Sequence, residues 1–294
     1  MDSARLVVVS PVHNEAGHIE RVARSLARQS LRPATWIVVD DGSDDTTSEL
    51  LERLQPELDF LTVLRLPAAE ETRDPRAAAA VARAFNAGLA LVELSEFDFV
   101  AKLDADVELP SDYFEAILGR MRIDPSLGIA CGNLVEPAGT DWTRISIPRH
   151  HVDGAFKLYT RRCLLDIGGI RECLGWDTID ETYARMNGYR TRSFSDLVAR
   201  HHSPSAASRG RLRGREQQGA VAWIAHYGLG WVAVRSLKVA AQRRPRIISG
   251  FAFFYGYGWA GARRVSRVDD PEFRRYVRGE LRSRLLASLG PHPA

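Results

Sequence analysis

Cysteine is scarce in this chain, and the few cysteines exclude a disulfide-stabilised scaffold. Only Cys131, Cys163 and Cys173 occur among 294 residues, and no two of them form a Cys-x-x-Cys pair. This usage is typical of a protein from a reducing cytoplasm. We interpret Cys163 and Cys173 as core residues, because neither they nor His150 and His151 have the spacing of a zinc site.

Other familiar signatures are also missing. The sequence contains neither GxxxxGK[ST] nor GxGxxG, which excludes the phosphate loops of P-loop and dinucleotide-binding proteins. No apolar run reaches the roughly 20 residues needed to cross a bilayer. The opening residues, MDSARLVVVSPVHNE, lack a basic segment followed by a long apolar run, so we expect no secretory signal.

What is present is the composition of a globular protein with unevenly placed charge. Hydrophobic residues make up 45% and charged residues 26%, which excludes a disordered or fibrous chain. The net charge is only +3, but from Arg209 onward 17 Lys and Arg oppose 5 Asp and Glu. The remainder carries 23 basic and 32 acidic residues, so an acidic body precedes a basic tail. We expect the two parts to meet different partners.

Short apolar, β-branched runs alternate with helical patterns in the first hundred residues. This alternation predicts an α/β fold with a mostly parallel sheet and helices on both faces. The expected strands are Leu6–Val9, Trp36–Val39, Leu61–Leu64 and Phe97–Leu103. The expected helices are Glu15–Gln29, a helix capped by Ser43 or Asp44 that runs through Leu51, and Arg76–Leu91.

The carboxyl ends of these strands are rich in acidic residues, and ligands of parallel sheets bind at such ends. Asp104 and Asp106 follow the strand that ends at Leu103. Two carboxylates at this spacing can share one hard divalent cation, which would neutralise a diphosphate. Taken alone, the pair is also common in ordinary turns.

The basic tail contains a small, polar segment and two uncharged stretches. Ser203–Gly219 has the composition of a linker or mobile loop. Gly219–Val234 and Ile247–Ala262 are rich in Gly and aromatic residues and are bounded by arginines. They fit amphipathic helices that lie in the headgroup plane of an anionic membrane. The alternative is a pair of core helices that pack on the domain.

Several motifs follow one another along residues 5–205. They are Val7–Glu15, Ile37–Thr46, Lys102–Asp106, Gly154–Tyr159 with Ile167–Gly169, Gly175–Asp177 ahead of Asn187–Tyr189, and Val198–His202. In this order they resemble the family 2 glycosyltransferases, which have the GT-A fold and are mostly inverting. The basic, aromatic tail is similar to that of a bacterial subgroup of the family.

The resemblance implies a GT-A domain in residues 1–205, with the mixed sheet of Rossmann-like nucleotide-diphospho-sugar transferases, and a basic, aromatic helical region in residues 206–294. It implies a cation, Mg²⁺ or Mn²⁺, held by Asp104, Asp106 and His201, with His202 as the alternative histidine. The nucleotide-sugar contacts that it implies come from Pro11, His13, Asn14, Glu15, Asp40, Asp41, Arg76, Arg83, Asp104 and Gly154.

Some of these implied contacts have purely structural alternatives. By the resemblance, Asp41 would accept a hydrogen bond from a uracil ring N–H, but an Asp at a strand end also forms turns. Glu15 is also placed as a helix N-terminal carboxylate that the macrodipole favours. Arg76 and Arg83 would contact base or phosphate, or else lie on a solvated helix face.

The resemblance also points to Asp177 as the general base of an inverting transfer, which needs one carboxylate beside the acceptor hydroxyl. The family pattern usually has Glu-Asp at this place, whereas this chain has Trp176-Asp177 followed by Asp180-Glu181. Asp180 and Glu181 are therefore rival bases. A capping box, with Asp177 at the helix N-cap and Asp180 three residues on, is the structural alternative.

Together these features predict a metal-dependent, inverting glycosyltransferase. It would move a sugar from a nucleotide-diphosphate sugar, UDP-linked by preference, to a lipid-linked or polysaccharide acceptor. The basic tail would bind an anionic membrane, so we expect a cytoplasmic enzyme peripheral to the inner face of the cell membrane. The alternatives are transfer to polyprenyl phosphate or a small metabolite, or a non-catalytic protein that binds nucleotide sugar or nucleic acid. The acidic body and the lack of a recognised module argue against nucleic acid.

Overall fold

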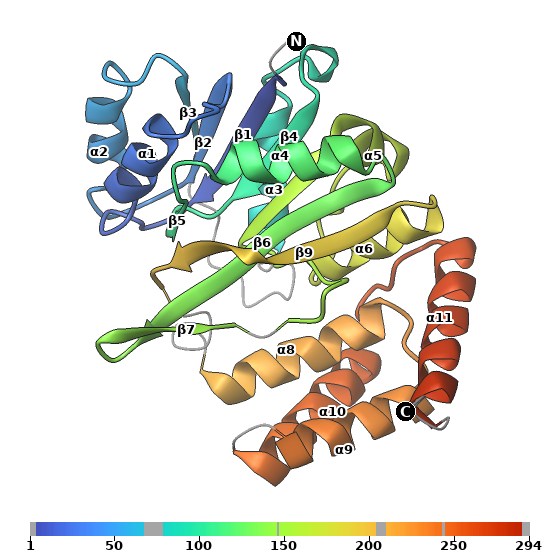
Figure 1. Ribbon diagram of the computed structural model, residues 1–294. Coiled ribbons are helices and arrows are strands. Elements are labelled where there is room, and N and C mark those ends of the chain that lie inside the picture. Colours follow the sequence, from blue (N-terminus) through green and yellow to red (C-terminus); the bar gives the residue numbers. More distant parts are fainter. Residues whose placement is uncertain (1–3, 68–78, 146, 204–209, 243–244, 290–294) are drawn as a thin grey trace. The chain divides into compact units, whose positions relative to one another are not determined.

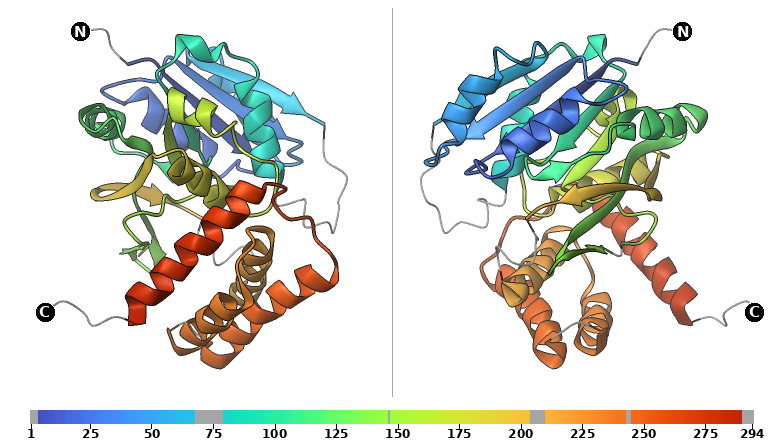
Figure 2. Two further views of the ribbon diagram at one scale, coloured as in Figure 1. Left: turned by 90° about the vertical axis from the view of Figure 1, so that its right-hand side faces the viewer. Right: turned by 60° about the vertical axis from the view of Figure 1, so that its left-hand side comes forward.

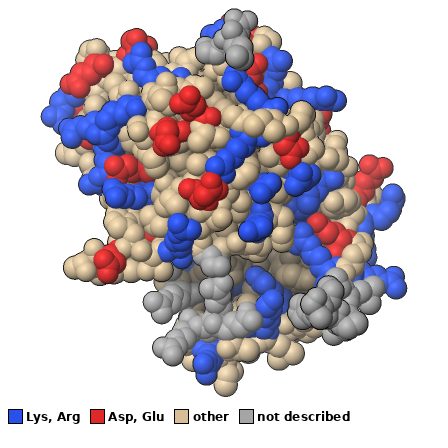
Figure 3. All heavy atoms as spheres, in the orientation of Figure 1, with Lys and Arg blue, Asp and Glu red and all other residues tan. Residues whose placement is uncertain are grey.

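The computed structural model describes residues 4–67, 79–145, 147–203, 210–242 and 245–289, so the predicted contact residue Arg76 lies outside the described residues. The chain divides into two compact units, Met1–Pro204 (unit 1) and Ser205–Ala294 (unit 2). Unit 1 contains the sheet and unit 2 is helical (Figure 1). On the face of unit 1 seen in Figure 3, Lys and Arg side chains alternate with Asp and Glu.

The described part of unit 1 is built on one nine-stranded sheet with the order β3-β2-β1-β4-β8-β6-β9-β5, and β7 pairs with β6. The strands β3, β2, β1 and β4 are parallel, β8 is antiparallel to β4, and β6 is parallel to β9. The predicted mixed α/β sheet is thereby confirmed. The strands are β1 (Leu6–Val12), β2 (Thr35–Asp41), β3 (Leu61–Leu66), β4 (Phe99–Leu103), β5 (Val107–Glu108), β6 (Leu127–Ala138), β7 (Asp141–Arg144), β8 (Phe156–Thr160) and β9 (Arg190–His201).

Helices cover both faces of the parallel half of this sheet. The right-handed crossovers from β1 to β2 and from β2 to β3 put α1 and α2 on one face, and the return to β4 puts α3 on the other (Figures 1 and 2). Because both faces are covered, β1 and β2 are almost continuously buried and apolar. The helices are α1 (Ile19–Ala27), α2 (Thr47–Leu54), α3 (Ala80–Leu89), α4 (Tyr113–Ile123), α5 (Arg161–Asp166) and α6 (Trp176–Met186), with a 3₁₀ turn at Leu94–Glu96.

Two helix starts differ from the sequence-based prediction. The first helix begins at Ile19 and not at Glu15, because the preceding residues form a loop bonded to the loop after β2. The second begins at Thr47, and its N-cap residue is Thr46, so the predicted caps Ser43 and Asp44 were wrong. Their side chains bond instead to Asn14 across the two loops.

The described part of unit 2 consists of four helices, α8 (Arg211–Ile224), α9 (Leu229–Gln242), α10 (Arg246–Ala262) and α11 (Pro271–Leu289). Because α8 starts at Arg211, the prediction of a linker or mobile loop is wrong for residues 211–219. The stretch Gly219–Val234 is not one helix either. It is divided between α8 and α9 by a turn in which His226 has a φ of 61°.

The helices α8, α9 and α10 pack at glycines around a small core of Ala222, Val232 and Phe253. A Cβ atom at Gly219 would lie 2.0 Å from the carbonyl oxygen of Phe253, and one at Gly256 would lie 2.0 Å from that of Glu216. The backbones of α8 and α10 therefore touch where neither helix has a side chain. This contact buries one face of α10, while large side chains on the opposite face, such as Phe251, are exposed.

We predict that Gly256→Ala lowers the free energy of unfolding of unit 2 by at least about 1–3 kcal/mol, because the new methyl group overlaps backbone atoms. Gly258→Ala is the matched control on the same helix, since a Cβ there meets nothing within 4 Å. Its higher helix propensity would be neutral or stabilising by up to about 1 kcal/mol. Urea denaturation followed by circular dichroism measures both, and equal midpoints for the two variants would contradict the packing described.

Candidate active site

Side-chain hydrogen bonds connect the loops that follow β1 and β2. Asn14, with a φ of 58°, donates from its side-chain amide to Asp44 Oδ1 (2.6 Å) and accepts from Asp44 N (2.9 Å). The backbone N–H of Asn14 donates to Ser43 Oγ at 3.0 Å, and that of Glu15 donates to Thr47 Oγ1 at 2.8 Å. A non-glycine residue stays in the left-handed region only where its surroundings hold it. Asn14 therefore fixes the shape of this pair of loops.

The two aspartates at the end of β2 have different surroundings. Asp40 is buried and accepts hydrogen bonds from Ser43 N and Ser48 Oγ. Burial pushes the pKa of Asp40 upward, but these hydrogen bonds outweigh burial and hold the pKa below its ordinary value. Asp41 lies instead 3.5 Å from the guanidinium of Arg83, with its side chain 13% exposed. Its carbonyl oxygen is 3.0 Å from His13 Nδ1. Asp41 is thus the aspartate of the pair that a ligand can reach.

Asp106 and His201 form a buried pair at the centre of the site. Strand β5 pairs with β9 so that Val107 lies opposite His201, and this register brings His201 Nε2 to 3.1 Å from Asp106 Oδ2. Burial alone would lower the pKa of His201, but Asp106, with help from Asp104, raises it to about 9. His201 Nδ1 lies 3.3 Å from Glu136 Oε1. The second oxygen, Asp106 Oδ1, is buried and has no hydrogen-bond partner among the described residues.

Negative charge is in excess around this pair. Burial raises the pKa of Glu15 to about 7, and the charges of Asp106, Asp104 and Asp45 add to the effect. In the described ranges, no three His, Cys, Asp or Glu side chains already stand in an arrangement that could hold a metal ion. The structure thus brings Glu15, Asp104, Asp106 and His201 into one electrostatic group without a complete ligand set.

A pair of buried lysines lies beneath the site. Lys102 on β4 and Lys157 on β8 are direct partners in the antiparallel register, and both are buried. The ammonium of Lys102 pairs with Asp104 Oδ1 and donates to the carbonyl oxygen of Gly154 at 2.6 Å. The Trp176 ring lies 5.5 Å from each ammonium group. The lysines therefore position Asp104 and the glycine loop before β8.

Lys157 binds the first turn of α6 and its two adjacent acids. Its ammonium lies 2.8 Å from Asp180 Oδ1 and 3.4 Å from Glu181 Oε1, and it donates to the carbonyl oxygen of Asp177. Asp180 also accepts from the Tyr159 hydroxyl. Burial raises the pKa of Asp180 to about 6, against the opposing charge of Lys157. Asp180 and Glu181 are both buried in this network, which favours neither as a base for an acceptor from solvent.

Asp177 has different surroundings from its two rivals. The N-cap of α6 is Gly175, with a φ of 80°, so Asp177 is the second helical residue and the capping-box alternative is wrong. Its side chain is half-buried and adjoins Gly154, where a Cβ atom would lie 3.3 Å from Asp177 Oδ2. The absence of a side chain at Gly154 therefore keeps space open beside the Asp177 carboxylate.

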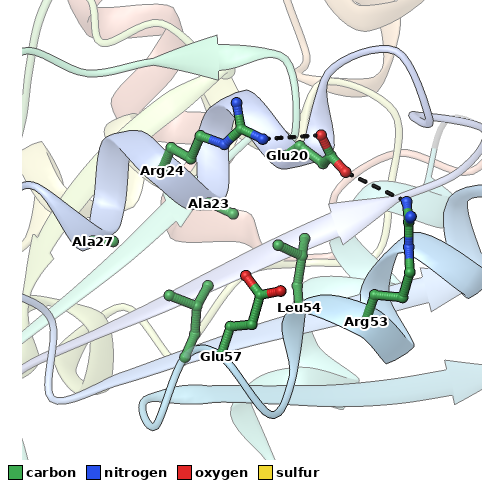
Figure 4. Close-up of a pocket in the computed structure, with 8 residues that line it drawn as sticks. Glu20, Ala23, Arg24, Ala27, Arg53, Leu54 and Glu57 are labelled. Atoms are coloured by element: carbon green, nitrogen blue, oxygen red, sulfur yellow. Dashed lines mark hydrogen bonds and ion pairs between the residues drawn. The ribbon is translucent and has the colours of Figure 1, made fainter.

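The remaining predicted residues lie at the margin. His202, the alternative histidine, places Nε2 at 2.9 Å from Glu108 Oε2, while His201 contacts Asp106. Pro11 is half-buried within β1. A surface pocket between α1 and α2 contains none of the predicted residues, and its polar wall is formed by Glu20 between two arginines (Figure 4).

Sequence reasoning missed the two lysines and the contact of His201 with Glu136. The available signal was a lysine within an otherwise apolar strand, FVAKL for Lys102 and FKLYT for Lys157. A lysine is rarely buried without a partner, so its presence in such a strand indicates nearby carboxylates.

Comparison with known proteins identifies the family. The family model described as Glycosyl transferase family 2 matches residues 7–171, which is more than half of the chain. A poly-beta-1,6-N-acetyl-D-glucosamine synthase from Staphylococcus aureus is 28% identical over 121 residues, or 41% of this chain and 26% of that protein. The chain therefore spans about a quarter of the length of the curated relatives that it matches.

Solved structures show the same fold at low identity. TarS 1–349 from S. aureus, in complex with UDP-GlcNAc, has a TM-score of 0.54 and 19% identity over 74% of this chain and 65% of that one. The mannosyltransferase PcManGT from Pyrobaculum calidifontis, in complex with GDP-Man and Mn²⁺, has a TM-score of 0.57 and 18% identity over 99% of this chain and 82% of that one. The predicted GT-A fold is confirmed by these likenesses.

We predict that Lys157→Met lowers the free energy of unfolding by about 3–5 kcal/mol, because it leaves the carboxylate of Asp180 buried without its cation, whereas Glu181 keeps His151 and Arg185. The double variant Lys157→Met/Asp180→Asn would recover part of this loss. Lys238→Met, at an exposed lysine, is the control and would change stability by less than about 0.5 kcal/mol. Urea denaturation at pH 7.5 distinguishes these cases, and a Lys157→Met protein as stable as the control would refute the role given to the ammonium.

Proposed function

This chain belongs to glycosyl transferase family 2, and on that premise we propose that it transfers a sugar from a nucleotide-diphosphate sugar to a hydroxyl acceptor. The proposal rests on one observation: three features lie together at the carboxyl ends of the sheet strands. These are the loops held by Asn14 beside Asp41, the buried pair of Asp106 and His201, and the half-buried carboxylate of Asp177. In this proposal the loops bind the nucleoside, the buried pair holds the cation that neutralises the diphosphate, and Asp177 is the base.

We take UDP as the nucleotide of the donor. In this proposal Asp41 accepts a hydrogen bond from the ring N–H of uracil, while the guanidinium of Arg83, 3.5 Å away, orients the carboxylate. Two observations on related proteins support the choice, since TarS is solved with UDP and with UDP-GlcNAc. The mannosyltransferase from P. calidifontis is solved with GDP-Man. If this chain used a GDP-sugar as its donor, the choice of UDP would be wrong.

The residues fit a divalent cation, Mg²⁺ or Mn²⁺. Asp106 Oδ1 is a buried carboxylate oxygen without a partner among the described residues, an imidazole nitrogen adjoins the other oxygen, and Glu15 has a raised pKa of about 7 through burial and its acidic neighbours. Oxygen and imidazole ligands suit Mn²⁺, and oxygen ligands suit Mg²⁺. Asp106 and His201 would hold the ion, with Asp104 beside it; His201 would bind as the neutral imidazole, and so would give up to solvent the proton that Asp106 and Asp104 otherwise keep on the ring. When bound, such an ion supplies positive charge that neutralises a diphosphate.

Asp177 acts as the general base in this proposal. The acceptor hydroxyl gives its proton to the Asp177 carboxylate while its oxygen attacks the anomeric carbon, and the bond to the diphosphate breaks on the opposite face. The transfer therefore inverts the anomeric configuration. Lys157 holds the Asp177 carbonyl and so the start of α6, whereas Asp180 and Glu181 neutralise that lysine.

We propose a lipid-linked or polysaccharide intermediate as the acceptor, handled by a cytoplasmic enzyme at the inner face of the cell membrane. The choice of a polysaccharide as the acceptor is supported by the name of the matched relative, a poly-beta-1,6-N-acetyl-D-glucosamine synthase. A membrane-bound intermediate is supported by the basic composition of unit 2.

We predict that Asp177→Asn lowers the rate of UDP release from UDP-GlcNAc at least about 100-fold, because the acceptor hydroxyl loses its base. The assay uses a lipid extract of the source organism as acceptor, with Mg²⁺ or Mn²⁺, and GDP-mannose as the second donor. Donor affinity would stay within about threefold, since Asp177 does not bind the nucleotide. The control is Asp59→Asn, at a side chain that is 83% exposed. Full activity in Asp177→Asn would overturn the assignment, and no release from either donor would overturn the proposed reaction.

A further inference from the structure

One face of α10 presents large apolar side chains to solvent. Ile247, Ile248, Phe251, Phe254 and Tyr255 are between 43% and 81% exposed. Their spacing of one, four, seven and eight residues from Ile247 places all five on one side of the helix. Gly258 and Ala262 continue the same row, so the stripe runs almost the whole length of α10. A soluble surface rarely carries such a continuous apolar row without a partner.

The core of unit 2 does not use this face. The buried side of α10 consists of small residues and Phe253, and it meets α8 at Gly256 and α9 at Gly250. A Cβ atom at Gly250 would lie 2.5 Å from the carbonyl oxygen of Ser236 on α9. Since α10 is already packed through its opposite side, the exposed aromatic side chains are not needed to hold the helices together.

The adjoining helix α9 has exposed apolar residues of its own. Val234 is 48% and Leu237 72% exposed, and Gly230 and Ala241 lie on the same side at helical spacing. Leu229, at its first turn, is 59% exposed. Two neighbouring helices of unit 2 thus each expose an apolar row, and we call the pair, Leu229–Gln242 with Arg246–Ala262, the α9–α10 hairpin.

The segment that contains these rows carries charge of one sign. No acidic residue occurs between Glu216 and Asp269, whereas this segment contains eight Lys and Arg. In the view of Figure 3, the part of unit 2 formed by α9 and α10 shows blue and tan atoms. The described cationic residues of the segment are Arg235, Lys238, Arg246, Arg263, Arg264 and Arg267. A partner surface that matches this segment would therefore carry negative charge on its outside and have an apolar layer beneath that charge.

We propose that the α9–α10 hairpin is a membrane-docking element that inserts the apolar row of α10 into the headgroup region of an anionic lipid bilayer. Aromatic side chains favour the boundary between headgroups and acyl chains, and Lys and Arg bind anionic headgroups. Each cation at an anionic surface strengthens partitioning about fivefold. Among the described helices, none is long and apolar enough to cross a membrane. The hairpin lies on the bilayer, and the sugar transfer proposed above does not depend on it.

Vesicle sedimentation of the full chain tests this inference. Vesicles of phosphatidylcholine alone are compared with vesicles containing about 30% phosphatidylglycerol. We expect at least tenfold stronger binding to the anionic vesicles, weakened by salt. Phe251→Ser/Phe254→Ser would reduce binding at least tenfold. The matched control, Leu91→Ser/Ile123→Ser, removes apolar side chains of unit 1 that are 51% and 86% exposed and would leave binding unchanged.

Two further readouts keep the result interpretable. Circular dichroism shows whether each variant is folded. The variant Lys238→Glu/Arg246→Glu tests the charge of the hairpin without altering its apolar row, and we expect this variant to lose the preference for anionic vesicles.

Equal binding to both kinds of vesicle, or equal binding of folded Phe251→Ser/Phe254→Ser and wild-type protein, would overturn the proposal. So would sedimentation of the wild type as a dimer that the double serine variant abolishes, because the face would then be a contact between copies. Nucleotide binding by the serine variant would be unchanged in every case, which separates this inference from the proposed reaction.

Discussion

Two buried lysines on neighbouring strands impose the constraint on which the site depends. Lys102 and Lys157 are two of the three lysines in the chain, and they lie opposite each other in the register of β4 and β8. Like charges placed in this way repel, and burial adds to the cost, so each ammonium requires anionic and carbonyl partners. Lys102 takes Asp104 and the Gly154 carbonyl, and Lys157 takes the acids and the carbonyl at the start of α6. Three segments far apart in sequence are thereby fixed at one sheet edge.

This arrangement separates the acidic residues into two groups with different tasks. Asp180 and Glu181 are buried and pair with Lys157, and Glu181 also contacts His151 and Arg185. Asp177 is the accessible carboxylate of α6. On the other side, Asp104 pairs with Lys102 and Asp106 with His201, but one oxygen of Asp106 has no hydrogen-bond partner among the described residues, and burial and acidic neighbours raise the pKa of Glu15. In the function proposed above, this group of acids binds the cation that neutralises the diphosphate of the nucleotide sugar. On this proposal, the acids that neutralise Lys157 and the acids that bind the donor are adjacent but distinct.

Much of this was predictable from the sequence, and the failures have local physical causes. The strands were predicted because parallel strands buried on both faces read as continuous apolar runs, as in Leu6–Val9. The burial of Asp180 and Glu181 beside a half-buried Asp177 was not predicted, because it depends on a lysine on β8 some 20 residues earlier. Ser43 and Asp44 resembled helix caps, but Asn14, distant in sequence, takes their hydrogen-bonding groups. The polar composition of Arg211–Gly219 suggested a loop, yet glycine lets this segment pack against α10 as helix.

The central claim is that this acidic sheet edge binds a nucleotide diphosphate through Asp106 with a divalent cation. Calorimetric titration of UDP, GDP and dTDP, with and without Mn²⁺, into wild-type protein and Asp106→Ala tests it most directly. The account predicts UDP binding that requires the cation in the wild type and is lost in Asp106→Ala. Binding of no nucleotide under any condition, or UDP binding that is the same in Asp106→Ala and wild type, would contradict it.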